Sequence, residues 1–334
     1  MSLAVVRLFL LPALLASTLL VSSCVQKPAE SKNAETQSAA ESRPPAPLEE
    51  VVLFPVKVEG KYGYIDKEGK IVIQPKFAAA SRFAEGLAGV QNDTGKWGFI
   101  DGSGSYRIQP AFEAVQFFSE GLAAVMQGEQ YGFIDSNGKM VIEPKFAGAK
   151  GFKDGFATVV RAEKMANTVV QTSGFIDKQG KYLVELLSDA GGFSEGLAAA
   201  RWMGQYFSYI DTSGKKVIEP GPGANRHFQR AGEFSEGLAP VALQQTGRWG
   251  YINRRGEIVI SPKFGMAQSF SEGRAAVVDR SGKWGYIDSS GKMVIQPKFS
   301  EAAAFLNGLA QVGLDGTKIG YIDQDGKYVW APRS

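Results

Sequence analysis

The side chains on which most nucleophilic and zinc chemistry depends are nearly absent from this sequence. Among 334 residues there is one Cys, Cys24, and one His, His227. A single Cys excludes a disulfide within the chain, and the two residues together exclude a zinc site built from several such ligands. A Ser-His-Asp or Cys-His mechanism would have to use His227, and the spacing of the sequence assigns it no charged partner. The sequence therefore predicts no catalytic residue, no metal site and no cofactor.

Carboxylates are abundant, with 34 Asp and Glu residues, but no pair among them stands out as the acid and base of a glycoside hydrolase. Acidic residues recur in turns of the type Phe-x-Glu-Gly, at Glu85, Glu120, Asp154, Glu195, Glu236 and Glu272, with Asn307 in the last copy. Gathered on one rim, they would bind cations or basic partners. The favoured interpretation is a turn residue that accepts backbone hydrogen bonds.

The composition bounds the class of protein. Hydrophobic residues make up 44% of the chain and charged residues 21%, which fits a globular protein and excludes a wholly disordered one. Lys and Arg number 37, and the formal net charge is +3. So small an excess of positive charge gives no electrostatic basis for binding nucleic acid.

The N-terminus is predicted to be a targeting segment. Residues 1–23 contain Arg7 and an apolar stretch, residues 8–20, that is shorter than the ~20 residues of a membrane-spanning helix. This pattern indicates a signal peptide. The sequence that follows, Val21-Ser22-Ser23-Cys24, resembles the lipobox of bacterial lipoproteins; the alternative is an ordinary signal peptide with a chance Cys. The resemblance implies a lipidated Cys24 at the mature N-terminus and a place in the cell envelope. Because Val25 rather than Asp follows, it implies the outer membrane in a Gram-negative cell.

Residues 24–50 are predicted to be the lipidated N-terminus and a disordered linker. Residues 25–50 contain no aromatic residue and are rich in Pro, Ser, Ala and Glu. Such a segment cannot bury enough apolar surface to order itself.

Residues 51–331 contain one unit that is repeated about eight times. The marker Gly-aromatic-Ile-Asp, or a close variant, recurs at residues 63–66, 98–101, 132–135, 174–177, 208–211, 250–253, 285–288 and 320–323. A segment of the type Phe-Ser-Glu-Gly-Leu-Ala precedes all but the first, and Ile-Gln-Pro-Lys-Phe or a variant follows most of them. Three markers in one order at a nearly constant period indicate a tandem repeat.

In three copies Lys or Arg and then Trp precede the marker's Gly, at Lys96-Trp97-Gly98, Arg248-Trp249-Gly250 and Lys283-Trp284-Gly285. The repeat resembles the WG, or KWG, repeat family over about residues 51–331. Other residues stand in place of the Trp at Tyr62, Tyr131, Ser173, Phe207 and Ile319. Residues 183–187 replace the Pro-Lys-Phe segment in the fourth copy. The resemblance implies no defined activity.

Each unit reads as three short strands, for which residues 122–126, 131–135 and 139–143 are an example. An Asp-x-x-Gly-Lys turn joins the second strand to the third, and about ten residues lead to the next unit. Along the second strand, Trp97 and Phe99 share one face while Gly98 and Ile100 share the other, so both faces must be buried. Gly98 would permit close approach of a neighbouring backbone or ring. The sequence predicts an all-β tandem array of about eight three-stranded antiparallel units in a propeller-like toroid. An open β-solenoid or superhelix is the alternative.

Candidate contacts lie outside the repeated markers. The motif residues Trp97, Trp249 and Trp284 are expected to pack in the core, whereas Trp202 and Trp330 are freer to contact a partner. Two insertions lengthen the repeat: residues 162–172, and residues 221–232 with Arg226, His227 and Arg230.

The sequence therefore predicts a lipid-anchored envelope protein that acts as a non-enzymatic interaction scaffold for other macromolecules. A glycan- or peptidoglycan-binding module that uses exposed aromatic side chains is the alternative. The partner is an unidentified envelope protein or glycan, and the membrane is reached through the lipid on Cys24.

Overall fold

The computed structural model describes residues 50–165, 168–219, 227–314 and 318–331. The signal peptide, Cys24 and nearly all of the predicted linker, as well as Arg226, lie outside these described residues. The domain boundaries predicted at residues 23 and 50 therefore stay predictions.

The described part of the chain is all-β, as the sequence predicts: it contains antiparallel strands and no helix. Among these residues no helix is long and apolar enough to cross a membrane.

The Gly-aromatic-Ile-Asp marker forms the second strand of each unit. These strands are β2 (Lys61–Ile65), β6 (Trp97–Ile100), β10 (Gln130–Asp135), β14 (Thr168–Ile176), β17 (Ser208–Asp211), β21 (Trp249–Asn253), β25 (Trp284–Ile287) and β29 (Ile319–Ile322). The aromatic residue and the Ile of the marker are buried in every copy, so both faces of this strand are covered.

The first strand of each unit pairs with one edge of the second strand. The first strands are β1 (Phe54–Val58), β5 (Leu87–Gln91), β9 (Leu122–Gln127), β13 (Phe156–Met165), β16 (Leu197–Trp202), β20 (Leu238–Leu243), β24 (Ala275–Val278) and β28 (Ala310–Gly313). All but β1 carry the Ala of the Leu-Ala segment or of its variants. Ala88 packs in one buried cluster with Tyr64 of the preceding unit, and Ala123 does so with Phe99.

The third strand pairs with the other edge of the second strand. The third strands are β3 (Ile71–Phe77), β7 (Tyr106–Phe112), β11 (Met140–Phe146), the first half of β15 (Tyr182–Ser194), β18 (Lys216–Ile218), β22 (Ile258–Phe264), β26 (Met293–Phe299) and β30 (Tyr328–Trp330). An irregularity interrupts this pairing, as between Trp97, which faces Phe112, and Phe99, which faces Ile108.

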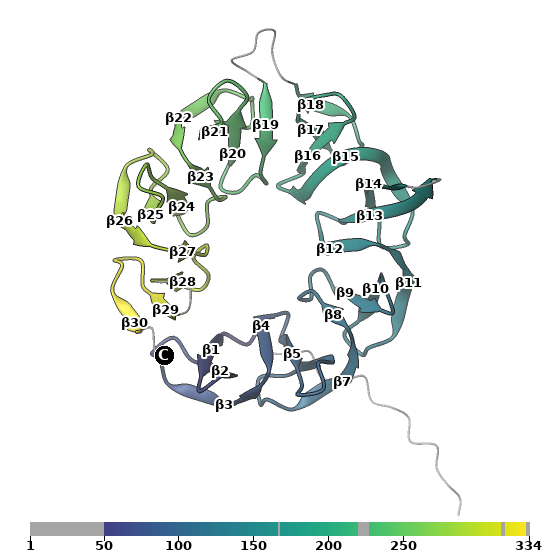
Figure 1. Cartoon of the computed structure of the whole chain (residues 1–334), viewed down its shortest axis with the longest axis vertical. Helices are drawn as coiled ribbons and strands as arrows, with labels where there is room; N and C mark the ends of the chain where they lie inside the picture. The colour runs from purple at the N-terminus through teal and green to yellow at the C-terminus, as the bar shows by residue number, and fades with distance from the viewer. Residues whose placement is uncertain (1–49, 166–167, 220–226, 315–317, 332–334) are drawn as a thin grey trace, which may run out of the picture. The chain divides into compact units, whose positions relative to one another are not determined.

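The segment between units was predicted to be a connection, and the structure shows a fourth strand in it. These linker strands are β4 (Ala79–Ala84), β8 (Ala114–Val115), β12 (Gly148–Lys153), the second half of β15, β19 (Phe228–Ala231), β23 (Met266–Ala267) and β27 (Glu301–Ala302). Each pairs with the free edge of the first strand that follows it, so three-stranded units become four-stranded sheets. In Figure 1 the linker strands β4, β12, β23 and β27 lie on the inner side of the sheets, and β3, β7, β11, β22 and β26 lie on the outer side.

Two sheets depart from the four-stranded pattern. β15 serves the fourth unit with its first half and the fifth unit with its second half, which merges both into one sheet of seven strands, β12 to β18. The first sheet holds only β1, β2 and β3, and no described strand takes the place of a linker strand there.

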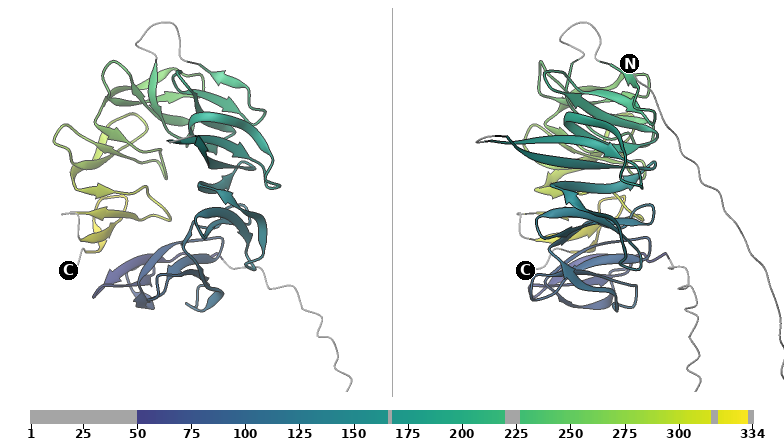
Figure 2. Two further views of the ribbon diagram at one scale, coloured as in Figure 1. Left: turned by 45° about the vertical axis from the view of Figure 1, so that its right-hand side comes forward. Right: turned by 90° about the vertical axis from the view of Figure 1, so that its right-hand side faces the viewer.

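The predicted insertion at residues 162–172 is mostly strand rather than loop. Ala162 faces Gln171 and Met165 faces Thr168, so the insertion lengthens the hairpin of β13 and β14. Figure 2 shows this hairpin extending beyond the neighbouring sheets. The other insertion continues into β19, and residues 220–226 lie outside the described chain.

The Gly of the Trp-Gly pair is required by backbone packing. A Cβ atom added to Gly98 would lie 2.5 Å from the Ile108 carbonyl oxygen and 2.7 Å from the Pro110 nitrogen. The same approach recurs at Gly132, Gly250 and Gly285, where the nearest atom is again the carbonyl oxygen of the third-strand Ile. The predicted close approach is therefore confirmed, and the partner is the irregular third strand of the same unit.

Candidate functional site

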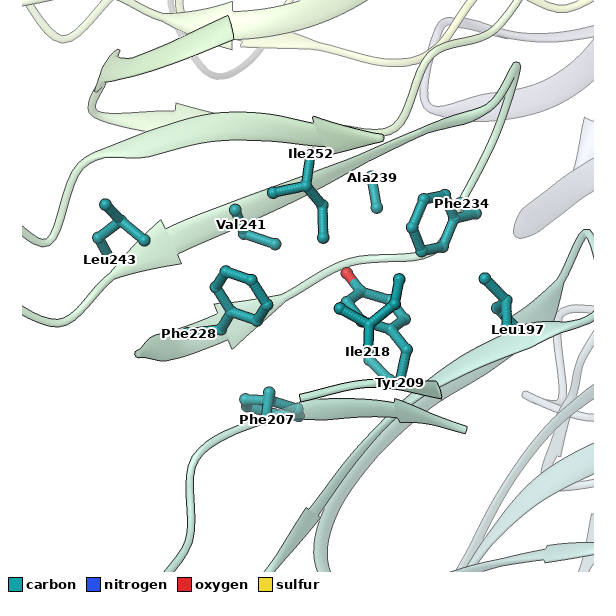
Figure 3. Close-up of a cluster of buried hydrophobic side chains, with 11 residues drawn as sticks. Leu197, Phe207, Tyr209, Ile218, Phe228, Phe234, Ala239, Val241, Leu243 and Ile252 are labelled. Atoms are coloured by element: carbon teal, nitrogen blue, oxygen red, sulfur yellow. The ribbon is translucent and has the colours of Figure 1, made fainter. Parts of the chain in front are cut away.

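The junctions between consecutive units use one repeated set of contacts. A Phe within or just after each linker strand packs edge-on or tilted against the aromatic residue of the preceding unit's second strand, as Phe83 does on Tyr64 with ring centroids 4.9 Å apart. Where that aromatic residue is Tyr, its hydroxyl donates to a carbonyl in or next to the linker strand, as Tyr286 does to Ala303 at 2.8 Å. Figure 3 shows one junction, where Tyr209 and Phe234 meet among Leu197, Phe228 and Val241.

The repeated acidic residues belong to these junctions. Each stands at positive φ in its turn, between 51° and 55°, and its carboxylate accepts a hydrogen bond from the turn Gly of the next unit. Examples are Glu85 with the Gly121 N–H at 2.9 Å and Glu272 with the Gly308 N–H at 2.9 Å. The interpretation as hydrogen-bond acceptors is confirmed, with the refinement that each bond joins two units. Among the described residues no group of acidic, His or Cys side chains is placed to hold a metal ion.

The last sheet contacts the first through the same kind of contact. The Tyr321 hydroxyl donates to the Pro55 carbonyl oxygen at 2.9 Å, and the Tyr321 ring lies 5.4 Å from that of Phe54. Phe54 of β1, Tyr321 of β29 and Trp330 of β30 belong to one buried cluster, together with Leu309 just before β28.

A polar hollow of about 440 Å³ lies where β12, β15, β16 and β19 approach each other; we call it the cationic hollow. Its charged lining consists of Lys150, Arg201, Arg230 and Asp189, and Phe207 and the motif residue Trp249 contribute aromatic rings. Three cations against one carboxylate give it a positive potential, and its volume lies in the range of about 300–1,000 Å³ typical of ligand sites.

Arg201 is held at the wall of this hollow. Its Nη2 atom lies 3.3 Å from Asp189 Oδ2, and its guanidinium carbon lies 4.9 Å from the centre of the Phe207 ring. The Nε atom of Arg201 is buried and has no hydrogen-bond partner among the described residues. Since Lys150 and Arg230 are exposed, the hollow keeps donors available for an anionic group.

His227 has partners that fit a structural role. Its ring stacks on Tyr206 with centroids 4.1 Å apart, and Nδ1 lies 3.4 Å from the Gln244 side-chain oxygen. No carboxylate pairs with this ring among the residues that the structure describes. Of the predicted contact residues that the structure describes, Arg230 alone lines the cationic hollow.

The two tryptophans predicted to contact a partner lie in different environments. Trp330 is only 6% exposed, so the expectation that it is free for a partner is wrong. It faces Tyr321 in the register where other units have the buried Ile of the third strand, and it fills the space between the first and last sheets. Trp202 is half-buried, with Lys216 Nζ 4.3 Å from its ring centre. The motif residues Trp97, Trp249 and Trp284 are half-buried and pack against buried clusters, as predicted.

Sequence reasoning missed Lys150 and Arg201. Lys150 lies in β12 and Arg201 in β16, at positions where the other units have no consistently charged residue. The two side chains come together because β12 and β16 belong to neighbouring units. The single signal in the sequence is that Arg201 stands where six other first strands have an uncharged residue, Gln91, Met126, Val160, Ala242, Val278 or Gly313.

Comparison with known proteins identifies the repeat. A family model described as WG containing repeat matches residues 62–97, 97–131, 131–164, 174–203, 249–283 and 284–317, which is more than half of the chain. No match is found among curated proteins.

Similar solved structures share little sequence with this chain. Dihydro-heme d1 dehydrogenase NirN in complex with DHE is 12% identical with a TM-score of 0.54, over 86% of this chain and 74% of that one. BamB from Moraxella catarrhalis is 12% identical with a TM-score of 0.47, over 78% and 90% of the two chains. The WD40 beta propeller domain of Doa1 is 11% identical with a TM-score of 0.42, over 82% and 92%. At these identities the likeness concerns the fold.

Proposed function

This chain belongs to the WG containing repeat family, and we propose that it is a non-enzymatic scaffold that binds an acidic macromolecule at the cationic hollow. The observation that carries the proposal is the hollow itself, with Lys150, Arg201 and Arg230 around a buried guanidinium nitrogen that has no partner among the described residues. Repeat arrays offer extended surfaces for recognition, and cations beside aromatic rings suit carboxylates.

We propose further that the sheets close into a propeller-like ring rather than an open solenoid. The hydrogen bond of Tyr321 to Pro55 and the cluster of Phe54, Leu309 and Trp330 support closure, because they repeat at the last-to-first junction the contacts of the internal junctions. Closure would fix the linker strands of the fourth, fifth and sixth units around the hollow.

We also propose a cellular location for the protein. The Val-Ser-Ser-Cys sequence after the apolar stretch supports lipidation at Cys24, with residues 25–50 as a tether at the cell envelope. Cells fed an alkyne-tagged fatty acid should label the full-length chain and should not label Cys24→Ala. A Cys24→Ala chain that still carries the label would refute lipidation at this site.

The binding proposal is tested by crosslinking in cells followed by capture of the full-length chain and mass spectrometry. The test variant is Lys150→Glu with Arg230→Glu. The matched control is Lys139→Glu with Lys292→Glu, which changes two exposed turn lysines and gives the same net charge. We expect one envelope protein to be enriched with the parent and control chains and lost with the test variant.

Two results would contradict the proposal. Equal enrichment with the test variant would show that the partner binds elsewhere. Recovery of cell-wall fragments without a protein would favour the glycan-binding alternative, and Trp202→Ala would then test its aromatic contact. A net charge of +3 on the whole chain gives no reason to expect nucleic acid.

A further inference from the structure

The hairpin of β13 and β14 continues beyond the sheet to which it belongs. In the fourth unit Leu187 of β15 faces Ser173 at the place where most other third strands end, and β15 then turns to pair with β16. On the other side of the hairpin, β12 pairs with β13 only as far as Val160. Residues 161–165 and 168–172 therefore form a ribbon of two strands beyond the sheet, which we call the arm (Figure 2).

The backbone of the arm leaves two residues of β14 facing outward. The Val160 carbonyl oxygen accepts a hydrogen bond at 2.8 Å from the N–H of the residue before β12, so the backbone groups of Val160 point away from β14. Because this direction alternates along an antiparallel ladder, Ala162 and Lys164 have the same orientation as Val160. Their partners across the ladder, Gln171 and Val169, direct their N–H and C=O groups to the opposite edge of the arm. No described strand pairs with this part of β14.

The two edges of the arm differ in charge. β13 carries Arg161, Glu163 and Lys164, and Arg161 Nη2 lies 2.6 Å from Glu163 Oε1. Charged side chains on an edge strand keep other strands from pairing with it. β14 contributes residues 168–172, Thr-Val-Val-Gln-Thr, which carry no charge and are mostly β-branched, and Val169 is 61% exposed. The β14 edge therefore combines a strand-forming sequence with no charge to protect it.

Exposed apolar side chains also lie at the base of the arm. Leu187, where β15 leaves the arm, faces Trp202. Leu186 and Met203 adjoin this pair in sequence and are 67% and 77% exposed. Together with Val169 they are the three most exposed large hydrophobic side chains in the described part of the chain. Apolar side chains exposed at one end of a sheet favour an interaction surface there.

We propose that the arm pairs with the arm of a second copy of this chain, β14 against β14 in antiparallel orientation, with a two-fold axis at Val170. In this register Val169 of one copy lies opposite Gln171 of the other, so the outward N–H and C=O groups of both residues gain partners. The two Val170 side chains lie opposite each other as an uncharged, β-branched pair, which sheets favour. Two ribbons of two strands, each marginal alone, become one sheet of four.

The occupant is a second copy because the β14 edge complements itself. Its two outward-facing residues are each other's partners across a two-fold axis, and no charge in residues 168–172 opposes the pairing. The β13 edge does not have this property: the same symmetric pairing there would place Glu163 opposite Glu163, and like charges directly opposite are destabilising. A two-fold contact of this kind closes on itself and yields a dimer rather than a fibre.

The first test places one Cys at the centre of the expected pairing. The parent is the chain from residue 24 with Cys24→Ser, which removes its only native thiol. In the expected register the Cβ atoms of Val170→Cys in two copies would be about 4.5–5.5 Å apart, close enough for a disulfide after small adjustment, so mild oxidation should give a covalent dimer. Glu163→Cys is the matched control, because Glu163 faces Val170 across the arm but lies on the charged edge. It should stay largely monomeric.

Sedimentation velocity over a concentration series tests the pairing without an added thiol. The Cys24→Ser parent should shift from monomer to dimer as its concentration rises. Val169→Pro removes an outward N–H without breaking the pairing to β13, and Val170→Lys places two like charges opposite each other. Each should weaken association by about tenfold or more. The matched controls on the other strand, Lys164→Pro and Ala162→Lys, should associate as the parent does.

A chain that stays monomeric at every concentration overturns the proposal, as does equal crosslinking of the two Cys variants or unchanged association of Val169→Pro and Val170→Lys. If the arm gains protection from hydrogen exchange only when lipid vesicles are added, its occupant is a membrane and the proposal is again overturned. Lys150→Glu with Arg230→Glu should dimerise normally, so this proposal and the one on the cationic hollow fail separately.

Discussion

Replacing Gly98 by Ala tests whether the Trp-Gly pair is set by backbone packing. The added Cβ would lie 2.5 Å from Ile108 O, 2.7 Å from Pro110 N and 2.9 Å from Gln109 C, all backbone atoms. Because no flexible side chain can move aside, β7 must shift and its pairing with β6 must loosen. Overpacking costs about 1–3 kcal/mol, and a clash with backbone belongs at the upper end, so we expect about 3 kcal/mol.

Gly151→Ala, in the linker strand β12, is the matched control. Its Cβ would meet only the Ser119 Cβ at 3.4 Å and Phe117 O at 3.9 Å, which are ordinary contacts. It should be neutral, or stabilising by about 0.4–1 kcal/mol through a less flexible unfolded chain. Urea unfolding measures the free-energy difference. Because repeat arrays can unfold in parts, hydrogen exchange should place the loss of protection in β6 and β7. A Gly98→Ala chain within about 0.5 kcal/mol of the parent chain would refute the reasoning.

Three further outcomes are expected. Burial raises the pKa of Tyr209 far above its usual value near 10. Absorbance titration of the folded chain, compared with that of Tyr209→Phe, should therefore show no ionisation of Tyr209. The stability that the protonated Tyr209 contributes should be lost as pH rises above about 10, because the unfolded chain then ionises. The Ser290 hydroxyl lowers the pKa of Asp288, so Ser290→Ala should raise that pKa in a carboxyl NMR titration; this small contribution is present above about pH 4 and is lost as pH falls through the lowered value. Trp330→Ala should cost about 3–5 kcal/mol and should increase hydrogen exchange in β1 as well as in β30, because one cluster joins them; unchanged exchange in β1 would argue against closure.

The strands and their turns were predictable because their signals are local and repeated. The alternation along Trp97 to Ile100 required two buried faces, and Gly98 between two large side chains required a close neighbour. The acidic turns were recognised as hydrogen-bond acceptors, since a short acidic side chain beside Gly has few other roles at positive φ.

The linker strands were missed because they carry no alternation of apolar and polar residues and because β8, β23 and β27 are very short. β8 is two residues long, Ala114–Val115, and its pairing with β9 is set by the sheet that it joins. The cationic hollow was missed for a similar reason: Lys150 and Arg201 are 51 positions apart and meet only when two units pack. Trp330 was misplaced because its burial depends on β1, almost the whole repeat domain away in sequence.

Three departures from the repeat, Phe54, Leu306 and Asn307, gather at the junction of the last and the first sheet. Ala becomes Phe54 in β1, which restores core packing without a linker strand. Ser becomes Leu306, which is 37% exposed and lines a mostly apolar groove with Phe54 and Leu309. Because Ser is the residue of most other turns at this position, Leu306→Ser should reduce the exposed apolar area and improve the solubility of the chain, and an unchanged solubility would contradict this reasoning.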